Sequence, residues 1–334
     1  SLLAQTLKQS DQIRFEERIN HALTIDPLKP FSVPSAQQDE VPIVLPTNKN
    51  INVVNILDIG TSANAYGYYA GTRSMVWYDK NLNAVANIHR MGGAGDPGGY
   101  SGDLGFDYSL DGGENWASDV EVYIAENNSG GEYYTDAARY PSLGIFNPNQ
   151  SADPNESWMV FFAPNLEGPN GGWGGYSYGV ANMGDPSIRT KNLQSSPTGV
   201  YQSLPSGFEI TSDGKIFVTD LNDDLTATVF QNSIIVEKGE WSDVAEDIVY
   251  EQELIDHFTD DELGSPTDVK IAFGADGQIG YMTVLSDDGS AEAISGFKGL
   301  YPVIFKTTDG GINWDDLGGI QLGGPEGLDG IVNG

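Results

Sequence analysis

The residues of this chain that could carry out chemistry begin with Ser177. It lies in GYSYG (residues 175–179), which fits the Gly-x-Ser-x-Gly pattern of a serine nucleophile, and His257 follows in the chain order of an α/β-hydrolase. That pattern requires a helix directly after the serine, whereas Gly184 and Pro186 follow shortly. The sequence therefore favours a glycine-rich loop here over a hydrolase nucleophile.

Paired carboxylates are a second source of chemistry, because glycoside hydrolysis needs two of them about 5 to 10 Å apart across a cleft. The chain has 48 Asp and Glu residues against 16 Lys and Arg, a formal net charge of −32. With so many carboxylates the sequence selects no pair, and each one is first expected on a solvated acidic surface. We therefore predict no catalytic residue. The same charge argues against nucleic acid or an anionic membrane as a partner, because both require a basic surface.

Calcium ligands can be predicted in one segment. Asp220, Asn222 and Asp224 occupy alternate positions in DLNDD, as at the start of a calcium loop, although the following glycine and the distal glutamate are missing. The same letters also suit a polar turn. GDPGGYSGDLGFD (residues 95–107) is a second candidate segment for calcium.

The histidines and cysteines argue against a transition-metal site. His21, His89 and His257 are far apart in the sequence and show no paired-ligand spacing. Cysteine is absent, which excludes thiolate zinc sites, disulfides and cysteine nucleophiles. Calcium is therefore the only cofactor that the sequence suggests.

Aromatic side chains could bind a sugar or a peptide by stacking. WMVFF (residues 158–162) is expected to form a buried strand. Trp173, Tyr176 and Tyr178 lie in glycine-rich sequence and are, together with Arg139, the candidate ligand-binding residues. Packing between sheets is the competing interpretation of these rings.

The elements that must position these residues are mostly strands. Beyond Asn50, short β-rich runs are separated by Gly, Asp and Asn; they are INVVNIL, SMVWYD, SWMVFFA, GKIFVTDL, GQIGYMTVL and YPVIFKT. The 42 glycines and 17 prolines suit many tight turns. One helix is predicted in this part, at about residues 245–263, ending before Pro266. The expected fold class is all-β.

The first 50 residues differ from the rest. Residues 1–24 are predicted to be a helical arm, from the partial apolar stripe of Leu7, Ile13, Phe15, Ile19 and Leu23. Residues 25–50 are rich in proline and are predicted to be an extended linker. Both have too few apolar residues to fold alone, so we expect the arm to pack on the rest of the chain or on another copy.

Two segments share the pattern [Ser/Thr]-x-Asp-Gly-Gly-x-Asn-Trp, namely SLDGGENW (residues 109–116) and TTDGGINW (residues 307–314). In such a hairpin the aspartate accepts hydrogen bonds from turn amides, the glycines allow positive φ, and the tryptophan is pinned by burial. The residues expected to have these structural roles are Ser109, Asp111, Gly112, Gly113, Trp116, Thr307, Asp309, Gly310, Gly311 and Trp314.

The pattern resembles the Asp-box (BNR repeat), the hairpin signature of sialidase-like and related β-propellers, with Asn115 and Asn313 where those families usually have Thr. The resemblance implies a β-propeller of four-stranded antiparallel blades over residues 51–334. Sialidase activity is not expected, because it needs three arginines around the substrate carboxylate, and the acidic surface would repel sialic acid.

Weaker copies of the repeat lie between the two boxes. FEITSDGKIFVTD (residues 208–220) parallels IAFGADGQIGYMTV (residues 271–284), and SIIVEKGEW (residues 233–241) resembles a decayed box. A repeat of about 65 residues gives four to five blades, so the chain is expected to form a small propeller or part of a larger one.

A second resemblance concerns location. ARYPSLGIFNPN (residues 138–149) and GGWGGYSYG (residues 171–179), followed by the two later repeats, are similar to large secreted proteins of Bacteroidota that are exported by the type IX route. This resemblance implies a bacterial protein that is secreted or on the cell surface.

We predict a non-enzymatic structural or adhesive interaction module whose loops bind a protein or a glycan, and whose arm contacts other copies of the chain, without membrane insertion. The alternative is a glycan-active hydrolase, a glycosidase on a sialidase-like scaffold. Two facing carboxylates in a cleft with flanking Trp or Tyr would favour the hydrolase, whereas an extended protein interface would favour the module.

Overall fold

The computed structural model describes residues 56–62, 74–92, 102–125, 136–167, 172–259, 266–296 and 298–320. The chain divides into two compact units, Ser1–Ile56 and Leu57–Gly334. The predicted arm, the predicted linker and residues 95–101 of the second calcium segment lie outside the described residues. Among the helices that are described, none has the length and apolar character to cross a membrane.

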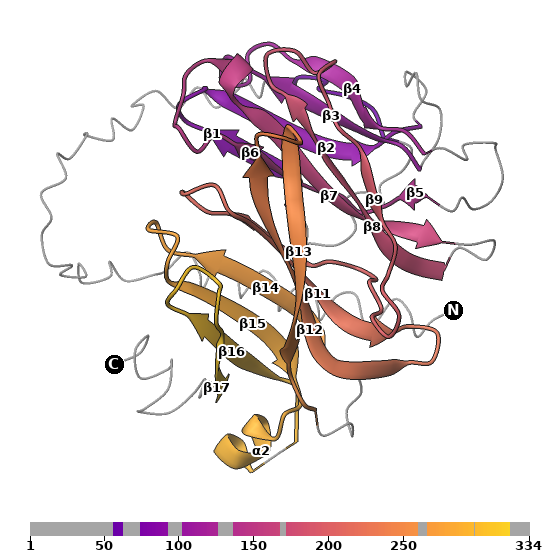
Figure 1. Cartoon of the computed structure of the whole chain (residues 1–334), viewed down its shortest axis with the longest axis vertical. Helices are drawn as coiled ribbons and strands as arrows, with labels where there is room; N and C mark the ends of the chain where they lie inside the picture. The colour runs from indigo at the N-terminus through magenta and orange to yellow at the C-terminus, as the bar shows by residue number, and fades with distance from the viewer. Residues whose placement is uncertain are drawn as a thin grey trace, which may run out of the picture. The chain divides into compact units, whose positions relative to one another are not determined.

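The described residues of the second unit form four antiparallel sheets, here called blades 1 to 4 (Figure 1). Blade 1 contains β1 (Val76–Asp79), β2 (Ala84–Arg90), β3 (Leu104–Ser109) and β4 (Ala117–Tyr123). Blade 2 contains β5 (Ala137–Ala138), β6 (Ser142–Phe146), β7 (Trp158–Glu167), β8 (Gly172–Asn182) and β9 (Asn192–Gln194). Blade 3 contains β10 (Gly207–Ile210), β11 (Ile216–Asp224), β12 (Val229–Ser242) and β13 (Asp247–Asp256). Blade 4 contains β14 (Thr267–Phe273), β15 (Gly280–Ser286), β16 (Tyr301–Thr307) and β17 (Asp315–Gly319).

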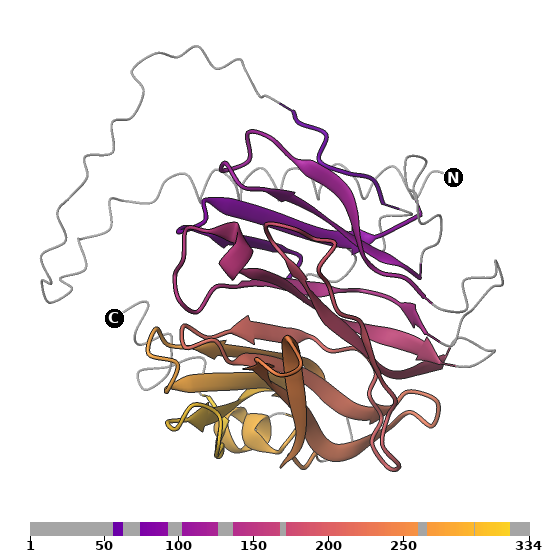
Figure 2. The ribbon, with the colours of Figure 1, turned by 45° about the horizontal axis from the view of Figure 1, so that its top comes forward.

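The blades contact one another in chain order through their first strands. β6 of blade 2 contacts β1 and β2, β10 of blade 3 contacts β6, and β14 of blade 4 contacts β10 and β11. A hydrophobic core lies between each successive pair of blades, and Figure 2 shows the four sheets following one another. Sheets related in this way are consecutive blades of a β-propeller. The predicted all-β fold of four-stranded antiparallel blades is therefore confirmed; in blade 2 the first strand position is divided between β5 and β6, which both pair with β7.

The pattern of buried residues in each strand depends on whether neighbouring blades cover one face of the strand or both. In β16, Val303, Phe305 and Thr307 are buried and alternate with partly exposed residues, as in a sheet with one covered face. In β7, by contrast, all residues from Met159 to Ala163 are buried, because blades 1 and 3 cover its two faces. The strand predicted from WMVFF is thus present.

The prediction of a helix at residues 245–263 is wrong. Residues Asp247–Asp256 form β13, which pairs along its whole length with β12, from Ser242↔Asp247 to Ser233↔Asp256. Strand pairing with a long neighbour overrides the local helical pattern. Elsewhere in the described part of the chain lie two short helices, the 3-10 helix η2 (Pro154–Glu156) in blade 2 and α2 (Ser290–Ser295) between β15 and β16.

The two repeated segments form hairpins in which the aspartate makes equivalent hydrogen bonds, and each joins the third and fourth strands of its blade. The tryptophans differ, because Trp116 Nε1 donates to the Gly113 carbonyl at 2.9 Å and Trp314 Nε1 has no partner among the described residues. Asp111 Oδ1 accepts the backbone N–H groups of Glu114 and Asn115 at 3.0 and 2.9 Å. Asp309 Oδ1 accepts those of Ile312 and Asn313 at 3.1 and 2.9 Å. Positive φ angles occur at Gly112, Gly113, Gly310 and Gly311.

The hairpin equivalent in blade 3 has a different turn. β12 and β13 continue their pairing as far as Ser242 and Asp247, so the turn lies further along the chain than in blade 4. The segment that resembles a decayed box, residues 233–241, therefore lies within a strand.

Replacing Asp111 by alanine is expected to lower the midpoint of thermal unfolding and to change the near-ultraviolet circular dichroism of the Trp116 hairpin. The Asn115 side chain and backbone, with the Ser109 hydroxyl, donate hydrogen bonds that lower the pKa of Asp111 to about 2, and alanine accepts none of them. Glu114→Ala, an exposed carboxylate on the same hairpin, is the control and should leave the midpoint unchanged. Equal midpoints for the two variants would show that the aspartate does not organise the turn.

Candidate functional site

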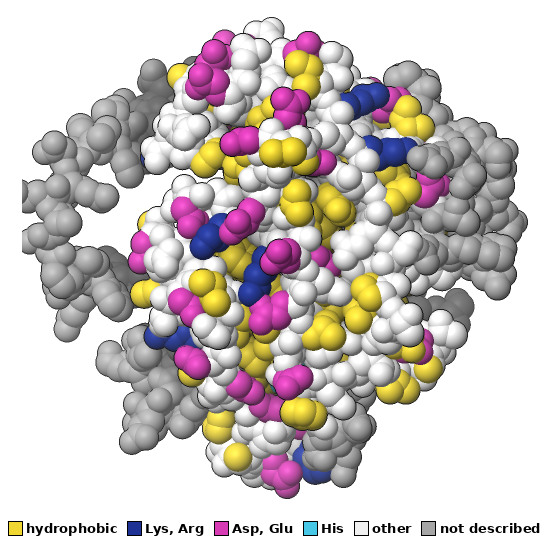
Figure 3. Space-filling model, viewed as in Figure 1, with side chains coloured by type: hydrophobic (Ala, Val, Ile, Leu, Met, Phe, Trp, Pro, Cys, Tyr) yellow, Lys and Arg dark blue, Asp and Glu magenta, His cyan; other side chains and the backbone are white. Residues whose placement is uncertain are grey.

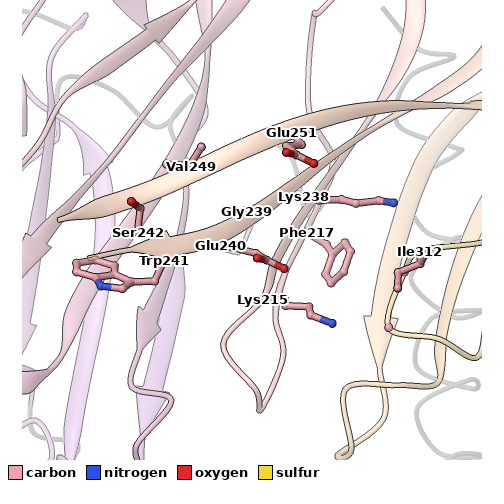
Figure 4. Close-up of a pocket in the computed structure, with 12 residues that line it drawn as sticks. Lys215, Phe217, Lys238, Gly239, Glu240, Trp241, Ser242, Val249, Glu251 and Ile312 are labelled. Carbon is pink, nitrogen blue, oxygen red and sulfur yellow. The ribbon is translucent and has the colours of Figure 1, made fainter. Parts of the chain in front are cut away.

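A groove of about 610 Å³ lies between blades 3 and 4, beside the second repeated hairpin (Figure 4). We call it the blade 3–4 groove. Its lining residues are Lys215, Phe217, Lys238, Gly239, Glu240, Trp241, Ser242, Val249, Glu251, Gly310, Gly311 and Ile312.

The groove forms because the β12–β13 hairpin is longer than its neighbours. Gly239 pairs with Ile216, the first residue of β11. Beyond it, Glu240, Trp241 and Ser242 pair with β13 but extend past the end of β11. On the facing blade, Gly310, Gly311 and Ile312 of the second repeated hairpin line the other side of the groove.

The basic and acidic side chains of the groove differ in whether they form ion pairs. Lys215 pairs with Asp213 at 3.6 Å, and Lys238 pairs with Glu253. Glu240 and Glu251 also line the groove and form no ion pair within the described residues. The free charge of the groove is therefore negative. On the face drawn in Figure 3, acidic side chains are more frequent than basic ones.

The groove also offers apolar surface. Val249 on β13 and Ile312 on the blade 4 hairpin are 51% and 66% exposed, although both are aliphatic. Figure 4 shows Phe217 and Lys238 directed toward the side that carries Ile312, with Trp241 at the opposite end. Trp241 is fixed there by rings of blade 2, with centroids 5.5 Å from Phe146 and 5.0 Å from Trp158. The site thus combines fixed rings, exposed aliphatic groups and free carboxylates.

A second cavity, of about 340 Å³, brings together two of the residues singled out in the sequence, Trp173 and Asp224. The Trp173 ring packs on Tyr140 with centroids 5.6 Å apart. Asp224 Oδ1 accepts the backbone N–H groups of Thr226 and Ala227 at 3.0 and 2.9 Å, and so holds the turn after β11.

The other two predicted calcium ligands are buried and bind protein groups. Asp220 Oδ2 accepts the Tyr176 hydroxyl at 2.9 Å and the Ser203 N–H at 2.8 Å. Asn222 Oδ1 accepts the Tyr201 N–H at 2.8 Å. These bonds attach the connection between blades 2 and 3 to β11. The role of these residues in calcium binding stays a prediction.

The remaining predicted ligand-binding residues lie mostly in the core. Tyr176 is fully buried, and Tyr178 packs on Phe162 and Tyr250 at ring distances of 5.9 and 4.9 Å. Arg139 is buried and donates to the Ala138 carbonyl at 2.9 Å. Trp173 alone of these four lines a cavity described above. Their role in binding stays a prediction.

The glycine-rich loop predicted around Ser177 is wrong, since these residues lie in β8. Ser177 is buried and donates to Asn165 Oδ1, and the strand continues to Asn182 where a nucleophile would need a helix. The glycines serve close packing instead. A Cβ at Gly179 would lie 2.3 Å from the carbonyl oxygen of Thr190.

Sequence reasoning missed a buried carboxylic acid between blades 2 and 3. Glu237 on β12 is 1% exposed. Burial raises its pKa to about 7 and the charge of Asp220 adds to this, although Gln194 and Gln202 donate hydrogen bonds to Oε1 at 3.2 and 3.3 Å and oppose the shift. The signal in the sequence was a glutamate at a buried position of the strand SIIVEK.

Comparison with known proteins gives the following. No family model and no curated protein matches the chain. Among solved structures, an exo-β-1,3-galactanase from Phanerochaete chrysosporium has 11% identity and a TM-score of 0.41, over 74% of this chain and 50% of that one. An endo-arabinase from Bacteroides thetaiotaomicron has 12% identity and a TM-score of 0.39, over 73% of this chain and 79% of that one. A GH74 enzyme from Niastella koreensis has 10% identity and a TM-score of 0.30, over 73% of this chain and 38% of that one.

This chain thus spans half the length of the galactanase. Likenesses at these TM-scores carry no argument about activity. The strand pairing and the order of contacts between the blades define the chain as consecutive antiparallel propeller blades.

Proposed function

We propose that this chain is a non-enzymatic binding module, and that the blade 3–4 groove binds an extended segment of a partner protein. The observation that carries this proposal is the groove itself, which exposed Val249 and Ile312 line together with the fixed rings of Phe217 and Trp241. Rigid aromatic and aliphatic anchors in a recess are typical of the central contacts of protein interfaces.

The charges indicate what kind of segment fits. Glu240 and Glu251 are free of ion pairs within the described residues, whereas the lysines of the groove are already paired. The net charge of −32 attracts cations from a distance. The favoured ligand is therefore a segment that alternates aliphatic and basic side chains.

We also propose that the module acts outside a bacterial cell, as a secreted or surface-displayed adhesive or structural part, and that it is an Asp-box propeller. This part of the proposal is supported by the sequence patterns of the two tryptophan-terminated hairpins and by the resemblance to type IX cargo proteins. Contact between copies through residues 1–24 belongs to the same proposal.

The test is a selection of peptides from a random phage-displayed library against the immobilised chain, followed by titration of the selected peptides. We expect aliphatic and basic residues to be enriched. Val249→Ser with Ile312→Ser should weaken their binding at least tenfold, because the variant loses both aliphatic anchors. The double variant Glu240→Gln with Glu251→Gln should also weaken binding, and the loss of affinity should be larger at low salt than at high salt.

Val244→Ser is the matched control, since Val244 is 98% exposed on the same hairpin but does not line the groove. It should leave the affinity unchanged. A selection without peptides that depend on the groove would contradict the proposal.

A glycan-active hydrolase is the second candidate, favoured by the raised pKa of Glu237 near Asp220, since an acid with a pKa of about 7 beside a second carboxylate suits glycoside hydrolysis. Both carboxylates are at least 97% buried and accept internal hydrogen bonds, which is why we place this candidate second. Reducing-sugar release from a panel of neutral polysaccharides, abolished in Glu237→Gln, would establish the hydrolase instead.

A further inference from the structure

Three side chains from adjacent strands of blade 1 meet on one face of the sheet. His89 lies on β2, Asp107 on β3 and Asp119 on β4. His89 Nε2 lies 3.3 Å from Asp107 Oδ1 and 3.7 Å from Asp119 Oδ1. One ligand atom from each residue lies within 4.8 Å of the other two. Spacing in the sequence could not reveal this group, because each strand supplies a single member.

The backbone of β4 is shaped to bring Asp119 into the group. The pairing of β3 with β4 shifts register between Phe106 and Tyr108, opposite the position of Asp119. Asp119 itself has a φ of 54°, a left-handed conformation that non-glycine residues seldom adopt. Its N–H donates to Asp107 Oδ1 at 2.8 Å, so the bulge holds the two aspartates together.

The imidazole is oriented by its other nitrogen. His89 Nδ1 lies 3.2 Å from the Arg90 carbonyl oxygen, which can only accept, so Nδ1 carries a proton. In the neutral ring Nε2 then presents a lone pair to two carboxylates. That arrangement is repulsive unless a positive charge lies between them, either a second proton on the ring or a metal ion.

The distances favour the metal. A charge-assisted N–H···O bond is about 2.7–2.9 Å long, shorter than both Nε2 to carboxylate separations. Ligand atoms about 2.0–2.2 Å from a tetrahedral zinc ion are about 3.3–3.6 Å from one another. The 3.3 Å separation falls in this range, and the 3.7 Å separation lies just above it.

The aspartates have outer partners of the kind that metal ligands have. Asn87 Nδ2 donates to Asp107 Oδ2 at 3.2 Å, and the Thr61 N–H donates to Asp119 Oδ1 at 2.9 Å. Gly60 lies so close that a Cβ there would be 2.1 Å from Asp107 Oδ1. The covering segment, Gly60 and Thr61, thus lies over the group, and His89 and Asp107 are each 1% exposed.

We propose that His89, Asp107 and Asp119 bind one divalent transition-metal ion of the zinc class, with a fourth position for the Thr61 hydroxyl or a water molecule. Nitrogen and oxygen ligands in this number suit Zn²⁺ or Co²⁺ better than Ca²⁺, which prefers six to eight oxygens. The ion would fasten the covering segment to blade 1.

The test uses the full chain, stripped with a chelator and titrated with Zn²⁺ by calorimetry in the presence of millimolar Mg²⁺, which occupies unspecific acidic sites. We expect one Zn²⁺ per chain, a higher midpoint of thermal unfolding with Zn²⁺, and stronger visible absorption of bound Co²⁺. Asp119→Asn should weaken Zn²⁺ binding at least tenfold and lose the thermal shift. His257→Gln, at a buried histidine in blade 3, should retain both.

The unfolding midpoint of Asp119→Asn without metal shows whether this variant is folded. If Asp119→Asn does not fold, His89→Gln is the second variant in which Zn²⁺ binding is measured. Long-range ¹⁵N–¹H spectra of the His89 ring give an independent measurement. Loss of the Nε2 proton signal on adding Zn²⁺ supports the site. A ring that stays doubly protonated with Zn²⁺, or unchanged binding in both variants, would overturn the proposal in favour of an imidazolium between two carboxylates.

Discussion

Phe217→Ala is expected to lower the free energy of unfolding by about 3–5 kcal/mol, which is the usual cost of deleting a buried aromatic ring. Phe217 is 1% exposed and belongs to the core between blades 3 and 4. Its ring stacks on Phe273 with centroids 4.4 Å apart. It also supports the blade 4 hairpin, because a Cβ at Gly311 would lie 2.6 Å from the ring. Urea unfolding followed by tryptophan fluorescence gives the change.

Phe258→Ala is the control, because Phe258 is 68% exposed. Its free energy of unfolding should stay within about 0.5 kcal/mol of the parent. Phe217→Leu keeps most of the apolar volume and should fall between the two. If Phe217→Ala were as stable as Phe258→Ala, the interface between blades 3 and 4 would not be a packed core.

Glu237→Gln is expected to stabilise the chain above pH 7, by up to about 3 kcal/mol, and to have little effect near pH 4. The raised pKa, from 4.5 to about 7, is the cause. Each pKa unit corresponds to about 1.4 kcal/mol. The replacement keeps Oε1 as the acceptor for Gln194 and Gln202, and its amide nitrogen can donate to Gln202 Oε1 or Tyr250 Oη, which have no partner in the described structure.

The sign follows from proton uptake. Below pH 4.5 Glu237 is protonated in both states, and its ionisation costs nothing. Between pH 4.5 and 7 the unfolded chain releases the proton while the folded chain keeps it, so the parent loses stability as the pH rises. Above pH 7 the loss is complete. The charged group that acts on Glu237 is Asp220 on β11. The nearby Tyr176, Tyr178 and Tyr250 have pKa values raised by burial and stay neutral over this range.

The measurement is the difference in free energy of unfolding between Glu237→Gln and the parent, from urea titrations between pH 4 and pH 8.5. Using a difference removes the contribution of the other carboxylates. Glu240→Gln, on the same strand but exposed, should give a flat difference near zero. A flat difference for Glu237→Gln as well would mean that the glutamate is hydrated in the folded chain.

The strands were predictable wherever the pattern of apolar residues matches the faces of the strand that neighbouring blades bury. Val303 and Phe305 alternate with half-exposed residues, and the WMVFF run is apolar because blades cover both of its sides. The hairpins were predictable because Asp111 and Asp309 accept hydrogen bonds from backbone N–H groups of their own turns, within eight residues of sequence. In each case the determining contacts are local or repeat along a single strand.

Other features depend on partners that are distant in the sequence. The prediction of a helix at residues 245–263 failed because β12, a longer strand, pairs with residues Asp247–Asp256 along their whole length. The glycines around Ser177 indicated a loop, but they allow the backbone near Thr190 to approach β8. The group of His89, Asp107 and Asp119 depends on cross-strand register and on one bulge, and neither can be read from spacing.

The placement of the cores between blades has a consequence for cooperativity. Each core is built by two neighbouring blades, so unfolding of one blade strips apolar surface from the next. Blades 2 and 3 are supported from both sides by such cores, whereas among the described residues blade 1 shares a core with blade 2 alone and blade 4 with blade 3 alone. Local opening should therefore begin at blade 1 or blade 4 and spread inward, as in a stack whose end members are each held by one neighbour.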